Sequence, residues 1–391
     1  MKRVIYVETS EDGGGSSESM IQAITHLDRS HYEPYVLFVN DLSHTKYVQR
    51  LHDMNVPVFT CHNAVYTKTS PLRRFYLHLL KISAHIPFLY LPLYRLIHGS
   101  SIRALETLVR EHNIDLIHLN ISIARDLFGV FVAKKQHIPC VSHIRSAKML
   151  SFPPAAQRFA NTYVDQFITI SDFIQDVWVG LGLDQNKCTT VLNGIDPLPA
   201  LERDYDSIPE KEKLTFCTVG RLVEWKNHSW LLQSFKAFLA IRPDAQLYIV
   251  GEGPEREKLE NILRGDGLEE NVILTGNVED PTEYLHASDI FVFPSRKEPF
   301  GRAVLEAMSL GMPLIAAQSG GIPEFVSDGE SGILVELNNV SALTDAMKML
   351  SSDGVLCARL GEAAKKNAGE KFSSKATTEQ IEKVYGNVTS S

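Results

Sequence analysis

The sequence predicts an α/β protein made of two doubly wound parallel-sheet domains. Short apolar, β-branched runs alternate with longer helical segments, which is typical of parallel strands joined by right-handed crossovers. The 391 residues, 44% of them hydrophobic, are enough for two cores. A proline-rich and charged stretch, 196–209, separates the runs into two series, as an interdomain linker does.

The expected strands come in two sets of five. They cover residues 4–7, 35–39, 116–119, 140–143 and 166–170, then 214–219, 246–250, 272–275, 290–294 and 313–317. Open parallel sheets bind ligands beyond the carboxyl ends of their strands, so the active site is expected in a cleft between the domains. The expected domains are 1–197 and 198–371, followed by a terminal helical segment, 372–391.

Charge and cysteine content narrow the class of protein. Residues 1–195 carry 19 Lys and Arg against 16 Asp and Glu, a net +3, while the remainder carries 20 against 31, a net −11. The first half is therefore expected to face any anionic partner. An odd number of cysteines, five, without C-x-x-C or metal-ligand spacing indicates reduced thiols in the cytoplasm rather than a disulfide framework.

The chain shows no membrane-spanning or secretory segment. Its apolar runs are shorter than the eighteen or so residues that a span needs. The first apolar run ends at Glu8 after a few residues, so it is predicted to be the first strand and not a signal peptide.

The most informative segment is 298–306, in which Glu298 and Glu306 bracket a glycine turn after the apolar run 290–294. It predicts strand, turn and helix start, with Glu306 about two turns into the helix. The free N–H groups near Phe300, Gly301 and Arg302 would converge on one point, where the helix dipole favours a phosphate. Carboxylates beside an anion must accept hydrogen bonds from hydroxyl groups. A nucleotide sugar offers such hydroxyls on both sides of its diphosphate.

Arg221 and Lys226 follow the expected strand 214–219 and are predicted to reach the same diphosphate. Their charge would stabilise the leaving phosphate, as a metal ion does elsewhere. The alternative is a pair of solvated surface cations.

Five elements in order resemble the retaining glycosyltransferases of the GT-B fold, in particular family four. Segment 298–306 resembles that family's E-x7-E motif, 220–227 its G-R-L-x-x-x-K-[GN] segment, 320–324 its G-G-x-P-E turn and 193–196 its N-G-[IV]-D element. Gly13, Gly14 and Gly15 stand where the family has a glycine loop after its first strand. The resemblance implies transfer of a sugar from a nucleotide donor with retention, no cofactor and no metal, and a final helix that crosses back to the first domain.

The resemblance also implies residue roles. Glu306 would bind the ribose and Glu298 the hexose, with Arg221, Lys226, Glu298 and His143 as the catalytic group. His143 ends an expected strand and would contact the hexose, and His118 competes for that role. His118 and Arg145 are assigned to the acceptor, and Arg145, where relatives commonly have Asp, suggests an anionic acceptor. The expected donor site consists of Gly14, Gly15, Arg221, Lys226, Gly251, Asn277, Val278, Glu298, Phe300, Gly301, Arg302, Ala303 and Glu306.

Residues 66–110 break the strand and helix alternation. They contain seven Lys and Arg against a single acid, Glu106, and are rich in Tyr, Phe and Leu. Such a segment is typical of an amphipathic surface that binds an anionic membrane. The alternative is a helical insertion with its aromatics packed inward and its cations solvated.

Other matches and other functions were weighed. Asp204-Tyr205-Asp206 spells D-x-D but lies in the linker, and Arg256 stands where a dinucleotide fingerprint needs its third glycine. The predicted reaction is hexose transfer from a nucleotide sugar, with uridine favoured by family frequency, to a glycan or lipid-linked acceptor of the cell envelope. A nucleotide-sugar epimerase or hydrolase of the same fold is the alternative, and no nucleic-acid partner is expected. The expected location is the cytoplasm, at the inner membrane face if residues 66–110 bind lipid.

Overall fold

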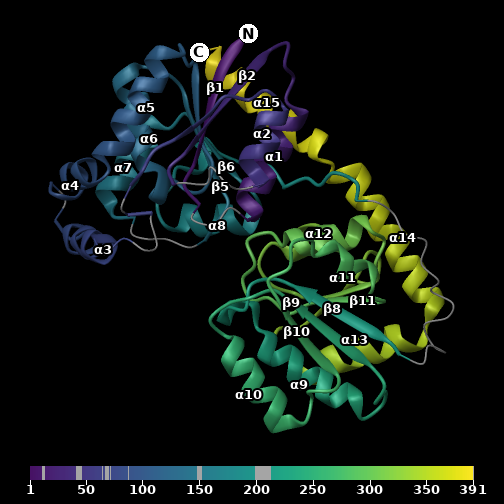
Figure 1. Ribbon diagram of the computed structural model, residues 1–391. Helices are drawn as coiled ribbons and strands as arrows, with labels where there is room; N and C mark the ends of the chain where they lie inside the picture. Colours follow the sequence, from purple (N-terminus) through teal and green to yellow (C-terminus); the bar gives the residue numbers. More distant parts are fainter. Residues whose placement is uncertain are drawn as a thin grey trace. The chain divides into compact units, whose positions relative to one another are not determined.

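The computed structural model describes residues 1–10, 14–40, 46–63, 65–66, 70, 72–86, 88–147, 152–198 and 213–390 (Figure 1). The chain forms two compact units. The first consists of Met1–Gly194 with Ser374–Ser391, and the second of Ile195–Ser373. Gly13, the Asp204-Tyr205-Asp206 triplet and most of the expected linker lie outside the described residues.

The first unit contains a seven-stranded parallel sheet in the order β3-β2-β1-β4-β5-β6-β7. Its strands are β1 Lys2–Glu8, β2 Tyr32–Phe38, β3 Val58–Thr60, β4 Leu116–Leu119, β5 Cys140–Ile144, β6 Gln166–Thr169 and β7 Cys188–Thr190. The strand order reverses between β1 and β4. This reversal is the topological switch point of a doubly wound sheet, where ligands bind.

Helices cover both faces of this sheet (Figure 1). They are α1 Gly15–His26, α2 Lys46–Asp53, α3 Leu72–Ser83, α4 Tyr90–Ile97, α5 Gly99–Glu111, α6 Ile123–Gln136, α7 Pro154–Tyr163, α8 Asp172–Gly180 and α15 Ser374–Thr389. On one face α1 packs against α2 and α15, and on the other α6 packs against α5, α4 and α7. Apolar side chains of β1, β2 and α1 form a continuous core with Ile381, Val384 and Tyr385 of α15. The last helix of the chain is therefore an integral part of the first unit.

The second unit contains a six-stranded parallel sheet in the order β10-β9-β8-β11-β12-β13. Its strands are β8 Thr215–Val219, β9 Gln246–Val250, β10 Val272–Gly276, β11 Ile290–Phe293, β12 Leu314–Ala317 and β13 Ile333–Val335. The switch point lies between β8 and β11. Strands β8, β11 and β12 are buried on both faces, which explains their largely apolar runs.

The helices of the second unit are α9 His228–Leu239, α10 Arg256–Asp266, α11 Thr282–His286, α12 Arg302–Ser309, α13 Val340–Ser352 and α14 Gly354–Lys371. Figure 1 shows α9, α10 and α13 on one side of the sheet and α12 on the other, where α12 packs against α14. Phe216, Phe235 and Phe238 pack edge to face at the centre of the core, with ring centroids 5.2–5.8 Å apart for the two pairs that include Phe216.

The expected fold class is confirmed, with two differences in detail. All ten expected strands are present, and among the described residues three further strands, β3, β7 and β13, complete the sheets. Strand β2 begins at Tyr32, three residues earlier than expected. None of the helices in the described ranges combines the length and the apolar character that a membrane crossing requires.

Candidate functional site

Two loops meet at the switch point of the second unit. One follows β8 and contains Arg221 and the short helix Glu224–Lys226, and the other follows β11 and leads to α12. The backbone N–H of Arg296 donates to the carbonyl of Trp225 at 2.7 Å, which ties the two loops together. The loops that carry the two predicted motifs, in which Lys226 and Glu298 are 72 residues apart in sequence, are thus neighbours at the edge where this fold binds ligands.

Lys226 and Glu298 form an ion pair across these loops. The Lys226 Nζ lies 2.8 Å from Glu298 Oε2, and the two side chains are only 12% and 9% exposed. The same ammonium lies 4.6 Å from the ring centroid of Trp225 and 4.5 Å from that of Phe293. Two aromatic faces and one carboxylate therefore fix the cation in place. Glu298 pairs with Lys226 and not with its neighbour Lys297, which is exposed.

The amino end of α12 stands beside this pair. Gly301 is the residue before the helix, with φ of 97°, and a Cβ there would come 2.6 Å from Cδ1 of Ile322. Only glycine fits this turn, so the chain enters the helix directly after Glu298. The first N–H groups of α12, from Arg302 and Ala303 onward, have no partner within the helix and so favour an anion. Phe300 is buried and stacks on Phe325, with ring centroids 4.6 Å apart.

The position of Glu306 corrects one expectation. Helix α12 begins at Arg302, so Glu306 is its fifth residue and lies just over one turn, not two, into the helix. Its Oε1 accepts a hydrogen bond from Arg302 Nε at 2.9 Å, and both side chains are about one-fifth exposed. The Glu306 carboxylate therefore lies near the amino end of α12, within its first turn and a half.

The remaining expected donor residues of the second unit lie in nearby loops. Arg221 is exposed and forms no ion pair with the residues that the structure describes. Gly251 directly follows β9, and its N–H donates to the carbonyl of Gly276. Asn277 and Val278 follow β10, Asn277 exposed and Val278 partly buried. The structure brings Lys226, Glu298 and the start of α12 into direct contact and places the other residues at the same carboxyl edge.

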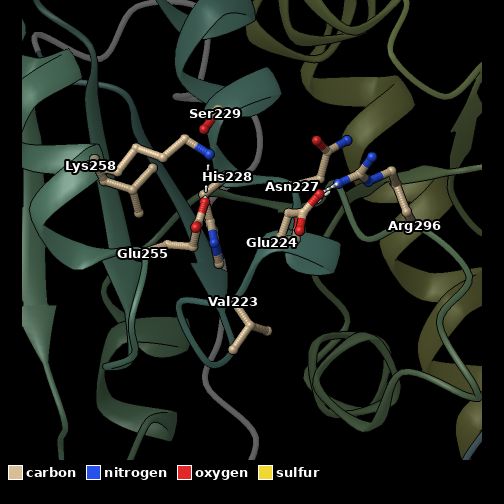
Figure 2. A pocket seen from close by; sticks show the side chains of 9 residues that line it. Val223, Glu224, Asn227, His228, Ser229, Glu255, Lys258 and Arg296 are labelled. Atoms are coloured by element: carbon tan, nitrogen blue, oxygen red, sulfur yellow. Dashed lines mark hydrogen bonds and ion pairs between the residues drawn. The ribbon is translucent and has the colours of Figure 1, made fainter. Parts of the chain in front are cut away.

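A small pocket of about 110 Å³ lies on the α9 and α10 side of the β8 loop. Figure 2 shows its charged side chains already paired, Glu255 with Lys258 at 2.6 Å and Glu224 with Arg296 at 3.4 Å. Neither Lys226 nor Glu298 lines it. The predicted donor residues therefore lie outside this pocket.

A second polar cluster lies at the switch point of the first unit. Glu8 ends β1 and accepts a hydrogen bond from Asn120, the residue after β4. Asn120 in turn accepts from Arg145 Nε at 3.0 Å, and Arg145 also donates to Asn193 at 2.6 Å and to His143 Nδ1 at 3.1 Å. The carboxyl ends of β1, β4 and β5 are joined by one hydrogen-bonded chain.

This chain fixes the state of His143. Burial, Arg145 and His118 hold the pKa of His143 well below its usual range, so the ring is neutral. A guanidinium only donates, so Nδ1 is the acceptor and the proton is on Nε2. The buried Nε2–H has no partner among the described residues. His143 therefore offers one hydrogen-bond donor at the end of β5.

His118 is held differently. Its Nδ1 lies 2.7 Å from the hydroxyl of Tyr385 on α15, and Tyr385 donates to Tyr6 at 2.9 Å. Burial lowers the pKa of His118 well below its usual range. The ring is part of a buried network that includes the last helix. Of the two expected histidines, His143 is the one bonded to the strand-end cluster.

The glycine loop is partly visible. Gly14 has φ of 90° and Gly15 begins α1, and the N–H of Gly14 donates to the hydroxyl of Tyr47 at 3.1 Å. Gly14 and Gly15 thus stand at the start of α1, the element that follows β1 in the chain. The loop therefore borders the same switch point as the Glu8 and Asn120 pair.

The sequence analysis did not single out Glu8, Asn120, Asn193 or Tyr385 as members of a site. The signal for the first two was available, because each is a polar residue directly at the end of an apolar strand. Asn193 and Tyr385 carried no such signal. Across the described ranges, no three or more His, Cys, Asp or Glu side chains gather as a metal ion would require.

Comparison with known proteins identifies the family. The glycosyl transferases group 1 family matches residues 202–367, and Glycosyltransferase Family 4 matches residues 13–197. The chain belongs to the group 1 glycosyltransferases of the GT-B fold. The family matches cover both units and include every motif on which the resemblance rested.

Individual relatives agree with this assignment. This glycosyltransferase is 26% identical over 326 residues to N-acetyl-alpha-D-glucosaminyl L-malate synthase of Bacillus anthracis, covering 80% of this chain and 84% of the relative. It is 28% identical over 244 residues to the capsular polysaccharide biosynthesis glycosyltransferase CapM of Staphylococcus aureus, covering 59% of this chain and 63% of CapM. The crystal structure of Anabaena Alr3699/HepE in complex with UDP and glucose matches with a TM-score of 0.75 at 19% identity, over 99% of this chain and 100% of that one, and shows the shared fold.

Proposed function

We propose that this glycosyltransferase moves a hexose from a UDP-linked donor to a hydroxyl of a glycan or lipid-linked acceptor, with retention of the anomeric configuration and without a metal ion. The observation that carries the proposal is the Lys226 and Glu298 pair at the start of α12, with the ammonium 2.8 Å from the carboxylate. A cation and a helix amino end favour the diphosphate, and the carboxylate beside them favours a sugar hydroxyl.

Each residue of the site has a specific role in the proposed reaction. Lys226, Arg221 and the N–H groups of α12 stabilise the negative charge that the diphosphate gains as it leaves. Glu298 accepts from the hexose hydroxyls, and Glu306 accepts from the ribose. No side chain in this set is placed as a nucleophile, so the acceptor hydroxyl attacks from the face that the diphosphate leaves, and a phosphate oxygen takes its proton.

The choice of uridine and of an envelope acceptor rests on relatives. The Anabaena protein of the same fold was crystallised with UDP-glucose, and CapM acts in capsular polysaccharide biosynthesis. We assign the second unit to the donor and the first, with His118 and Arg145, to the acceptor, while His143 contacts the hexose. The sequence interpretation of Arg145 as an anion ligand gains no support from its contacts, because its guanidinium donates to Asn120, Asn193 and His143.

We also propose that residues 66–110 hold the enzyme at the inner membrane face. These residues form α3, α4 and α5, and their aromatics divide into two groups. Tyr66, Tyr90 and Tyr94 are buried, whereas Phe75 and Phe88 are 56% and 82% exposed. Exposed Leu72, Ile82 and Leu96 lie on the same helices as the cations, a combination typical of surfaces that bind anionic lipid.

The donor assignment is tested by binding and turnover. Nucleotide diphosphates are screened for thermal stabilisation, where a ligand at a hundred times its Kd adds about 2.7 kcal/mol. Lys226→Ala and Glu306→Ala are then expected to lower donor turnover by about 100-fold or more, the scale of one lost charge stabiliser. Lys236→Ala is the matched control, since Lys236 is half-exposed and pairs with Asp266. Normal donor kinetics in both site variants would refute the proposal.

The reaction class and the membrane contact need separate measurements. Proton NMR of the product distinguishes retention from inversion at the anomeric carbon, and an inverted product contradicts the proposed mechanism. Chromatography of the donor after incubation without acceptor detects epimerisation or hydrolysis, and quantitative conversion there would assign a different reaction. Sedimentation with phosphatidylglycerol vesicles at low salt tests the surface, and Phe75→Glu is expected to abolish it. An unchanged bound fraction in that variant would rule the surface out.

A further inference from the structure

A cavity of about 370 Å³ opens among α3, α4 and α6 of the first unit. This volume is within the roughly 300–1,000 Å³ of pockets that bind small molecules. It is lined by residues of these three helices, by His98 between α4 and α5, and by Val65 and Tyr66 before α3. None of them belongs to the switch-point cluster of Glu8, Asn120 and His143.

The inner wall of the cavity is aromatic and neutral. Tyr66, Tyr94 and His98 are at most 2% exposed, and the His98 ring stacks on Tyr94 with centroids 4.0 Å apart. The hydroxyls of Tyr66 and Tyr94 both donate to the carbonyl of Arg125, so their protons are already used. Burial lowers the pKa of His98 to about 3, which keeps the ring uncharged. The wall offers a ligand mainly aromatic carbon.

The outer rim of the cavity is cationic. Arg74, His78 and Lys81 are exposed on α3, and the guanidinium of Arg125 lies 4.9 Å from the Tyr66 ring centroid. Neither Arg74 nor Lys81 pairs with a carboxylate among the residues that the structure describes. The lining residues include no Asp, Glu, Asn or Gln. This distinguishes the cavity from the pocket of Figure 2, where each cation has its own carboxylate.

This composition selects one class of ligand. A sugar needs carboxylates or carboxamides to receive and donate its hydroxyl hydrogen bonds, and the lining has none. An apolar chain gains free energy on an aromatic wall, and an anionic group gains it on unpaired cations. The exposed apolar residues Leu72, Phe75 and Ile82 lie on the helix that carries Arg74 and Lys81.

We propose that this cavity binds an anionic amphiphile, with an alkyl or isoprenoid chain against Tyr66, Tyr90 and Tyr94 and a phosphate on Arg74 and Lys81. This inference deepens the proposed function, because it makes the acceptor a lipid phosphate whose carrier is held by α3 and α4 while its sugar or hydroxyl end is free for transfer. The ligand is recognised by the combination of chain and charge, so inorganic phosphate alone and a neutral detergent alone should both bind poorly.

The experiment measures binding of monododecyl phosphate to the full chain by isothermal titration calorimetry, below the critical micelle concentration. Dodecyl maltoside and inorganic phosphate are the ligand controls. The wild type is expected to bind the dodecyl phosphate at least tenfold more tightly than either control. Equal affinity for dodecyl maltoside, or saturable binding of inorganic phosphate with similar affinity, would overturn the proposal.

Three variants locate the binding. Arg74→Ala with Lys81→Ala is expected to weaken binding at least tenfold, and Leu77→Trp, which fills the cavity, is expected to abolish it. Arg158→Ala is the matched control, because Arg158 is an exposed cation of α7 that neither lines the cavity nor belongs to residues 66–110. Equal losses in Arg158→Ala and in the double variant would show a diffuse surface effect and contradict the assignment, as would full binding by Leu77→Trp.

The outcome is separable from that of the donor site. Each variant is also tested for thermal stabilisation by UDP, which should be unchanged, because all four substituted residues lie in the first unit. Loss of both dodecyl phosphate binding and the UDP response in Leu77→Trp would indicate misfolding. Leu80→Trp, at another residue that lines the cavity, then takes its place, and full dodecyl phosphate binding by that variant would contradict the assignment. Intact dodecyl phosphate binding without any sugar transfer would refute the proposed function and leave the cavity assignment standing.

Discussion

The Lys226 and Glu298 pair allows the structural and the ligand-binding role of a single lysine to be separated. Lys226→Met removes the ammonium but keeps a side chain of similar length, whose sulfur packs well against the aromatic rings of Trp225 and Phe293. Glu298→Gln removes the opposite charge and keeps the shape. The experiment compares each of these two single variants with the double variant.

The expected magnitude follows from burial. With the side chains 12% and 9% exposed, removing one partner leaves a charge that water reaches poorly, and breaking such a pair costs about 3–5 kcal/mol. Because some exposure remains, we expect the lower end, about 3 kcal/mol. At about 2–4 °C per kcal/mol for a unit of this size, Lys226→Met should lower the Tm of the second unit by roughly 6–12 °C.

The double variant separates the structural role of Lys226 from its role in binding UDP. Lys226→Met with Glu298→Gln leaves no unpaired charge, so most of the lost stability should return. UDP affinity should not return, because the ammonium that binds the diphosphate is still missing. Thermal unfolding with and without UDP measures both quantities on the same samples. If the double variant regains wild-type UDP affinity, Lys226 acts only by neutralising Glu298, and its assignment to the phosphate is wrong.

Three further predictions concern stability. Gly320→Ala should lower the free energy of unfolding by about 2–4 kcal/mol, because φ is 64° and a Cβ would lie 2.2 Å from the carbonyl oxygen of Glu298; urea unfolding equal to wild type would contradict this. Tyr385→Phe should cost about 1–3 kcal/mol in urea unfolding, since His118 and Tyr6 lose a buried partner, and a loss below about 0.5 kcal/mol would mean that the network contributes little. Burial raises the pKa of Asp126 to about 6, so the folded state binds its proton more tightly than the unfolded state between about pH 4 and 6, and the contribution of this carboxyl to stability falls as the pH rises through that range. The stability of wild type relative to Asp126→Asn should therefore be higher at pH 4 than at pH 7 by on the order of 3 kcal/mol, and a pH-independent difference would show that the pKa is not raised.

The central strands could be predicted because they are buried on both faces. The run 290–294 is continuous in apolar residues and 116–119 is interrupted only by His118, and nothing but a parallel strand or a short buried helix fits them. The three missed strands, β3, β7 and β13, have three residues each and are only partly buried. A run of three residues is too short to be told from a loop in sequence, whether mixed in polarity as in β7 or apolar as in β13, and it becomes a strand only because a neighbouring strand supplies its hydrogen bonds.

In residues 66–110, composition does not predict which aromatic side chains are buried. Hydrophobicity alone would bury the phenylalanines before the tyrosines, yet Phe75 and Phe88 are exposed while Tyr66 and Tyr94 are buried. The reason is a specific acceptor, the carbonyl of Arg125, which receives both tyrosine hydroxyls. An interior position for tyrosine depends on such a partner, and here it lies 31 and 59 residues away along the chain.

Arg145 shows the same limit at the candidate site. In sequence it is an arginine two residues beyond a strand-end histidine, in a position where an anionic substrate is the natural partner for a guanidinium. In the structure its guanidinium donates to Asn120 and Asn193, 25 and 48 residues away, and to His143 Nδ1. The resulting constraint acts on His143, because a permanent donor at Nδ1 keeps the ring neutral and its single proton on Nε2. A hydroxyl that meets this nitrogen would find a hydrogen-bond donor and never a base, so in the proposed reaction His143 orients the hexose and does not remove the acceptor proton. The role proposed for His143 therefore depends on Arg145, whose guanidinium donates hydrogen bonds within the protein. These contacts form only in the folded chain, where three strands bring their carboxyl ends together.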